Sequence, residues 1–150
     1  MTEHVILLVE DNATDEELTL RVIKKHHIAN RVVVVRDGAE ALEYLFREGR
    51  YASGSDEKLP DVVLLDLNLP KIGGLEVLQR IRENPGTKLL PVVILTSSRE
   101  DRDLAAGYAS GANSYVVKPV DFTQFAEAVR QLGMYWLVLN QPSRPDIRGR

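Results

Sequence analysis

The sequence contains no cysteine, and this absence excludes several kinds of chemistry. Without thiols the 150-residue chain forms no disulfide, no thiolate nucleophile and no thiolate metal site. Long apolar runs are also missing. The first run, Val5–Val9, is too short for a signal-peptide core and leads directly into Glu10 and Asp11, and no run approaches the ~20 residues of a membrane helix. We therefore expect a soluble cytoplasmic protein without membrane attachment.

An excess of positive charge is lacking too. The chain has 19 Lys and Arg residues against 22 Asp and Glu residues, for a net charge of −3. Nucleic-acid-binding domains usually carry a basic stripe, so we expect no nucleic-acid partner. The hydrophobic content of 44% and the charged content of 27% are ordinary for a globular protein.

Five short apolar runs are spaced along the chain, and their continuous character is typical of parallel strands that are covered on both faces. They are Val5–Val9, Val32–Val35, Val62–Leu65, Val92–Leu95 and Ser114–Val117. Helical patterns separate them. The alternation predicts an α/β fold with a doubly wound, five-stranded parallel sheet.

The first four helices are indicated by start and stop signals. Thr14–Glu17 and Asp37–Glu40 both resemble capping boxes. The expected helices run from Thr14 to about His26, from Asp37 through Phe46, from Leu75 to the Asn84–Gly86 turn, and from about Glu100 to Ser110.

The last helix has an apolar stripe that continues unusually far. Its members recur at alternating steps of four and three, at Phe125, Val129, Leu132, Trp136 and Leu139. We predict an extended C-terminal helix that passes Gly133 and reaches about Asn140, before Pro142 forbids continuation.

Polar residues stand at the carboxyl ends of four of the predicted strands. They are Glu10 and Asp11 after the first, Asp66 after the third, Thr96 after the fourth and Lys118 after the fifth. Each alone would be interpreted as a solvated strand end or a helix cap, and Asp11 and Asn12 could simply cap the first helix. Doubly wound sheets bind ligands at this edge, however, so the convergence predicts a functional site.

These residue types together suit phosphoryl transfer. Three neighbouring carboxylates repel one another unless a cation compensates, and Mg²⁺ is a hard ion that prefers such oxygen ligands. Lys118 pairs with a carboxylate or a phosphoryl oxygen, and Thr96 can donate a hydrogen bond to the same oxygen. Charge on a transferring phosphoryl group would then be stabilised from three sides.

The nucleophile in such a reaction is best supplied by a carboxylate. A serine or threonine would need a nearby base, and none of the three histidines falls at this edge. A carboxylate is already ionised at neutral pH and can form an aspartyl phosphate. Spacing alone leaves open whether Asp66 or Asp11 is the nucleophile.

The segments that carry these residues resemble the receiver domain of two-component response regulators. They are VEDN after the first strand, LLDLNLPKIGGLEVL around the third, ILTSS at the fourth and YVVKPVD at the fifth, and the resemblance covers Val5–Leu132. It implies a flavodoxin-like strand order 2-1-3-4-5.

The resemblance also implies a role for each residue of the site. Asp66 would be the phosphoacceptor, and Glu10, Asp11, Asp66 and the backbone carbonyl of Asn68 would hold Mg²⁺. Thr96 and Lys118 would contact the phosphoryl group. Lys118–Pro119 would be a cis peptide, and Tyr115 would be an aromatic residue that swings inward on activation.

The implied function is that of a signalling receiver, not of an enzyme with other substrates. A sensor histidine kinase would supply the phosphoryl group, and the receiver would catalyse only its own phosphorylation and dephosphorylation. The alternative is a Mg²⁺-dependent phosphohydrolase with an aspartyl nucleophile. Such enzymes usually carry a second acid two positions after the nucleophile, where this chain has Asn68.

The C-terminal segment suggests how the signal is passed on. We expect a receiver domain over residues 1–133 and a helical extension with a polar tail over 134–150, with no separate output domain, so that output is protein contact or phosphorelay. Because Met134–Leu139 is apolar nearly all round, we predict a symmetric homodimer through this segment and the fourth and fifth helices. The alternative is a tail folded over its own domain. The ending resembles stand-alone regulators that are paired with phytochrome-type kinases.

Overall fold

A computed structural model describes residues 4–29, 31–52, 59–97, 109 and 111–134. Its five strands form one parallel sheet in the order β2-β1-β3-β4-β5, as predicted. They are β1 (Val5–Val9), β2 (Arg31–Val35), β3 (Val62–Asp66), β4 (Val92–Thr96) and β5 (Ser114–Val117). The strand order reverses between β1 and β3, and the carboxyl ends of these two strands therefore border the crevice where such sheets bind ligands.

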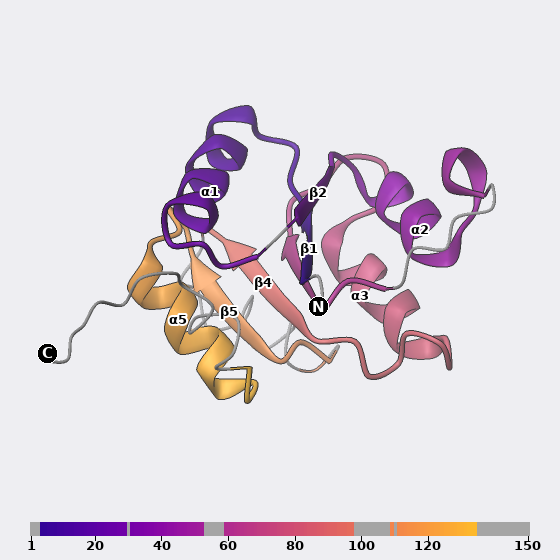
Figure 1. The fold of residues 1–150 in the computed structure, drawn as a ribbon. Helices are drawn as coiled ribbons and strands as arrows, with labels where there is room; N and C mark the ends of the chain where they lie inside the picture. Colours follow the sequence, from indigo (N-terminus) through magenta and orange to yellow (C-terminus); the bar gives the residue numbers. More distant parts are fainter. Residues whose placement is uncertain (1–3, 30, 53–58, 98–108, 110, 135–150) are drawn as a thin grey trace, which may run out of the picture.

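Helices cover both faces of this sheet (Figure 1). They are α1 (Ala13–Lys25), α2 (Gly38–Phe46), α3 (Gly74–Glu83) and α5 (Phe122–Gln131), with a short 3₁₀ turn at Gly49–Tyr51. Helices α1 and α5 lie on one face, and α2 and α3 on the other. The helix expected from about Glu100 to Ser110 lies outside the described residues, apart from Ala109.

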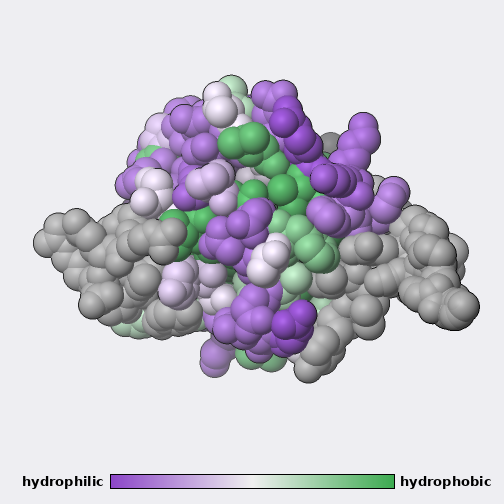
Figure 2. Space-filling model, turned by 90° about the vertical axis from the view of Figure 1, so that its left-hand side faces the viewer, coloured by the Kyte–Doolittle hydropathy of each residue, from purple (hydrophilic) through white to green (hydrophobic). Residues whose placement is uncertain are grey.

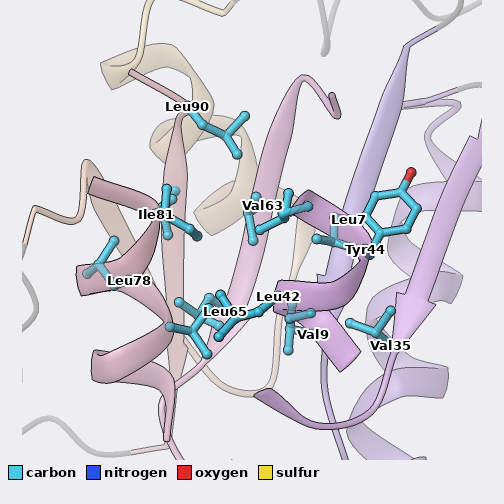
Figure 3. Packing of buried hydrophobic residues seen from close by; sticks show 14 of the residues in the cluster. Leu7, Val9, Val35, Leu42, Tyr44, Val63, Leu65, Leu78, Ile81 and Leu90 are labelled. Carbon is cyan, nitrogen blue, oxygen red and sulfur yellow. The ribbon is translucent and has the colours of Figure 1, made fainter. Parts of the chain in front are cut away.

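Alternate residues of each strand belong to two separate hydrophobic cores, because successive side chains of a strand point to opposite faces of the sheet. Leu8 and Leu64 join the core beneath α1 and α5, where Phe125 is fully buried. Leu7 and Val63 belong to the core under α2 and α3, and Figure 3 shows side chains from these strands and helices converging there. Strands β1, β3 and β4 are buried throughout, which explains their uninterrupted apolar runs in the sequence, whereas the edge strand β2 is mostly half-buried.

The start of α1 differs from its prediction. Its N-cap is Asn12, whose Oδ1 accepts a hydrogen bond of 2.9 Å from the backbone N–H of Asp15. Thr14 is therefore already inside the helix, and the predicted Thr14–Glu17 capping box was wrong. Asparagine caps as well as threonine, and it stands closer to the end of β1.

The prediction for α2 is confirmed. Asp37 is its N-cap and accepts a 2.7 Å hydrogen bond from the N–H of Glu40. The Glu40 carboxylate reaches back to accept a 3.2 Å hydrogen bond from the N–H of Arg36. The chain entering the helix is thus held from both sides, as in a capping box.

The C-terminal helix is present, but it ends earlier than the predicted Asn140. Gly133 adopts a φ of +74°, and the N–H of Met134 donates to the carbonyl of Val129 at 2.9 Å. This is a Schellman ending, and it closes α5 at Gln131. Met134 then packs, 7% exposed, into the core beneath α1 and α5. Residues 135–150 lie outside the described part of the chain.

The surface over α1 and α5 is mainly polar. Hydrophobic side chains gather in a central region of this face, bordered by hydrophilic ones (Figure 2). The end of α1 meets the start of α5 through the stacked rings of His26 and Phe122, whose centroids are 4.0 Å apart. No helix in the described ranges is both long enough and apolar enough to cross a membrane.

Candidate functional site: an acidic pocket at the carboxyl edge of the sheet

Three carboxylates meet at the carboxyl ends of β1 and β3. Glu10 and Asp11 follow β1 directly, and Asp66 is the last residue of β3. Because β1 and β3 are hydrogen-bonded neighbours, carboxylate oxygens of the three residues lie within 4.8 Å of one another. Glu10 and Asp66 are buried, whereas Asp11 is exposed. The structure therefore places the three predicted acidic residues together.

Lys118 reaches these carboxylates from the end of β5. Its Nζ lies 2.9 Å from Glu10 Oε1, and it donates 3.1 Å hydrogen bonds to Glu10 Oε2 and to Asp66 Oδ2. The backbone N–H of Lys118 donates to the carbonyl of Thr96 at 2.8 Å, which ties the end of β5 to β4. The Lys118–Pro119 peptide is cis, as expected.

One further carboxylate contacts the same ammonium group, and the sequence reasoning missed it. Asp15, in the first turn of α1, places Oδ2 2.9 Å from Lys118 Nζ. The available signal was Asn12: recognising it as the N-cap puts Asp15 three residues further along, in the turn that begins at the edge of the pocket. The assumed start at Thr14 concealed that position.

The loop between β3 and α3 contacts the carboxylate cluster at Asp66. The backbone N–H of Asn68 donates a 3.1 Å hydrogen bond to Asp66 Oδ1. A Cβ on Gly74 would overlap the backbone at the end of β3, so this position must be glycine for α3 to begin so close to Asp66. A cavity of about 330 Å³ is lined by Leu67, Asn68, Gly73 and Thr96, so its lining begins directly after Asp66 in the chain.

Burial and crowding alter the protonation of this cluster. Burial raises the pKa of Glu10 from 4.5 to about 7, against the opposing effect of Lys118 and with a further increase from Asp66. Burial lowers the pKa of Lys118, but the carboxylates of Glu10, Asp15 and Asp66 outweigh it, so the net shift is upward. Lys118 is thus charged at neutral pH, and this one cation faces several carboxylates.

The residues present fit a divalent cation. Glu10 Oε1 is buried, and among the described residues it contacts the Lys118 ammonium group at 2.9 Å and receives no further hydrogen bond. Ligand oxygens lie about 2.1 Å from Mg²⁺ and therefore up to about 4.2 Å apart across the ion. Oxygens that already lie within 4.8 Å of one another need only small side-chain rotations to reach that arrangement.

Thr96 and Tyr115 are the remaining predicted residues that the structure describes. Thr96 is buried at the last position of β4, beside the cavity. Tyr115, in β5, is 38% exposed and pairs in register with Ile94.

Comparison with known proteins agrees with this geometry. Residues 6–130 match the family described as the response regulator receiver domain. A probable methanogenesis regulatory protein, FilR2 of Methanothrix harundinacea, is 40% identical over 94% of this chain and 88% of its own length. Response regulator Rcp1 of Synechocystis is 38% identical over 89% of this chain and 88% of its own length. The structure of the bacteriophytochrome response regulator AtBRR superposes with a TM-score of 0.84 at 51% identity, covering 94% of this chain and all of that one.

The chain therefore belongs to the response regulator receiver family. It is a signalling receiver domain of the kind that takes a phosphoryl group from a histidine kinase onto an aspartate. Divalent cations bind receivers in an acidic pocket, and Glu10, Asp11 and Asp66 form an acidic cluster at the corresponding edge of this sheet.

Proposed function

We propose that Asp66 is the phosphoacceptor of this receiver and that its partner is a sensor histidine kinase. The observation that carries the proposal is the contact of Lys118 Nζ with Asp66 Oδ2 at 3.1 Å, beside Glu10 and Asp11. A carboxylate held at a strand end by an ammonium group, next to a cavity, is placed to receive a group that brings its own negative charge.

In the transfer, a carboxylate oxygen of Asp66 forms a bond to the phosphorus of the phosphohistidine. The phosphorus–nitrogen bond breaks, and its electron pair stays on the imidazole. Lys118 and Thr96 hydrogen-bond the phosphoryl oxygens, and Lys118 balances their added charge. Glu10, Asp11, Asp66 and the backbone carbonyl of Asn68 would hold Mg²⁺, which when bound neutralises charge on the phosphoryl group. Water later cleaves the acyl phosphate, so the chain acts only on itself.

Mass spectrometry after incubation with acetyl phosphate and Mg²⁺ tests this assignment. We expect one added phosphoryl group that hydroxylamine removes, and none in Asp66→Ala. Asp61→Asn is the matched control, because Asp61 precedes the same strand and lies at its other end, where its side chain accepts from the N–H of Val5. An adduct that survives Asp66→Ala would contradict the proposal. Multiple turnover of phosphomonoesters would favour a phosphohydrolase instead.

A phytochrome-type photosensor kinase is the proposed phosphoryl donor. This is supported by the resemblance to bacteriophytochrome response regulators. One of them, AtBRR, is 51% identical to this chain. Radiolabelled transfer from such a kinase to the wild-type chain, and not to Asp66→Ala, is the expected outcome. Transfer that is no faster than from an unrelated histidine kinase would argue against this pairing.

We propose that the protein is cytoplasmic, with a receiver domain over residues 1–133 and an extension over 134–150. Its output would be the formation of a homodimer or the passing of the phosphoryl group to a further protein in a phosphorelay. Residues 135–139 lie outside the described residues, and their apolar sequence supports an interface. Met134 was predicted to be part of this interface, but its side chain is buried in the core of its own domain and does not contribute to it. Light scattering should show a dimer for the full chain and a monomer after deletion of 135–150, which leaves Met134 in place.

A further inference from the structure

Lys118 has one more carboxylate partner than the phosphoryl-transfer site requires. Its Nζ contacts Asp15 Oδ2 at 2.9 Å, as closely as it contacts Glu10. The Asp15 side chain is 30% exposed, against 0% for Glu10 and 6% for Asp66. The ammonium group therefore lies between two inner carboxylates and one outer carboxylate.

The outer carboxylate is held in this position by the start of α1. The backbone N–H of Asp15 donates to the Asn12 side chain at 2.9 Å, and the N–H of Asn12 donates to Glu10 Oε2 at 3.2 Å. The next two acidic residues of α1 point elsewhere, because Glu16 pairs with Arg36 and Glu17 pairs with Arg21. Asp15 is thus the acidic residue of this turn that faces the pocket.

Lys118 and a divalent cation compete for the same inner oxygens. Glu10 and Asp66 belong to the carboxylate cluster that fits a cation, and both also contact Lys118. An ammonium group and a dication repel each other, so Lys118 loses part of its inner contacts when a cation binds. Asp15 is outside that carboxylate cluster, so it can still pair with the Lys118 ammonium group when a cation is bound.

We propose that Asp15 is a positioning residue that retains Lys118 at the mouth of the pocket and so allows a divalent cation to bind the inner carboxylates. The inference rests on the proposed function, because it assigns a task to the same site. Without the Asp15 charge, the ammonium group settles on Glu10 and Asp66 and opposes the cation. The Asp15 and Asp66 oxygens share one nitrogen and are therefore at most about 6 Å apart.

Calorimetric titration of the metal-free full chain with Mg²⁺ tests the proposal. An ammonium charge about 6 Å from a dication in a water-like dielectric weakens its binding by about tenfold, so Asp15→Asn, which leaves Lys118 on the inner carboxylates, should raise the Kd for Mg²⁺ by about that factor. Asp15→Glu keeps a carboxylate within reach and should stay within about threefold of the wild type. Glu17→Gln removes an equal charge from an exposed site and should change the Kd by less than about twofold.

The same titration in a Lys118→Met background separates positioning from simple charge. If Asp15 acts through Lys118, Asp15→Asn should have less than about a threefold effect there, because an unpaired Asp15 is screened by solvent. An equal effect in both backgrounds overturns the proposal. If Lys118→Met does not fold cooperatively, the NMR signal of the Lys118 ammonium group replaces it. The signal should persist with Mg²⁺ in the wild type and vanish in Asp15→Asn, and persistence in both overturns the proposal.

The outcomes also distinguish this inference from the proposed function. A wild-type chain that binds no Mg²⁺ and takes no phosphoryl group from acetyl phosphate defeats the proposed function. A wild-type chain that does both, while Asp15→Asn binds Mg²⁺ equally well, defeats the Asp15 inference alone.

Discussion

The buried carboxylate of Glu10 should make the metal-free protein less stable as the pH rises. Burial raises its pKa to about 7 in the folded state, compared with 4.5 when the chain is unfolded. Between these two values the unfolded chain loses the proton while the folded chain keeps it. Unfolding is therefore favoured progressively from pH 4.5 upward, and the full cost is present above pH 7.

The size of the effect follows from the shift in pKa. A difference of about 2.5 pKa units corresponds to roughly 3.4 kcal/mol in total. Linkage places about 2.5 kcal/mol of this loss between pH 5 and pH 8, because part of it has already occurred by pH 5. Asp121 does not interfere: hydrogen bonds from Gln124 lower its pKa, and the stability it contributes is lost only in more acidic solution.

Urea denaturation in the presence of a chelator measures this loss. Wild type should lose about 2.5 kcal/mol more unfolding free energy between pH 5 and pH 8 than Glu10→Gln, which cannot ionise at this position. Glu17→Gln, altered at an exposed position, should follow the wild type. Equal slopes for wild type and Glu10→Gln would refute the assignment of a raised pKa to Glu10. Addition of Mg²⁺ at pH 8 should restore stability, since binding favours the ionised carboxylate.

Three substitutions test the packing around the site in the same urea assay. Gly74→Ala should cost about 1–3 kcal/mol because its Cβ would overlap the end of β3, whereas Gly73→Ala, with open space around it, should cost less. Arg82→Met should cost about 3 kcal/mol because the guanidinium donates to three backbone carbonyls and one side-chain oxygen, and the exposed Arg80→Met should stay within about 0.5 kcal/mol. Gly133→Ala should cost about 1 kcal/mol because of its left-handed backbone.

The strands of the sheet were predictable because a strand that is buried on both faces has a continuous run of apolar residues in the sequence. The runs Val5–Val9 and Val62–Leu65 are apolar without alternation, and in the structure both are buried throughout. The strand ends were predictable for the same reason, because Glu10 and Lys118 are the first charged residues after their runs. The strand order came from the family resemblance, since the apolar runs carry no information about which strands pair.

The errors fall at helix ends, where two local signals compete. Thr14 and Asn12 are both acceptable caps, and a spacing rule chose the wrong one, with the result that Asp15 was not recognised as a neighbour of Lys118. At Gly133 the apolar stripe favours a continued helix, while the glycine favours a Schellman ending. The helix ends here because the left-handed turn at Gly133 allows the Met134 side chain to be buried in the core, which stabilises that turn.

The chemistry of the site depends on the complete sheet. Lys118 contacts carboxylates that are 108, 103 and 52 positions away in the sequence. None of these contacts can form until β1, β3 and β5 occupy their places, because no local segment contains both Lys118 and one of its partners. The free energy that holds β5 against β4 therefore also determines how often Lys118 is present at Asp66. A substitution that loosens β5 should reduce phosphorylation without touching any residue of the pocket.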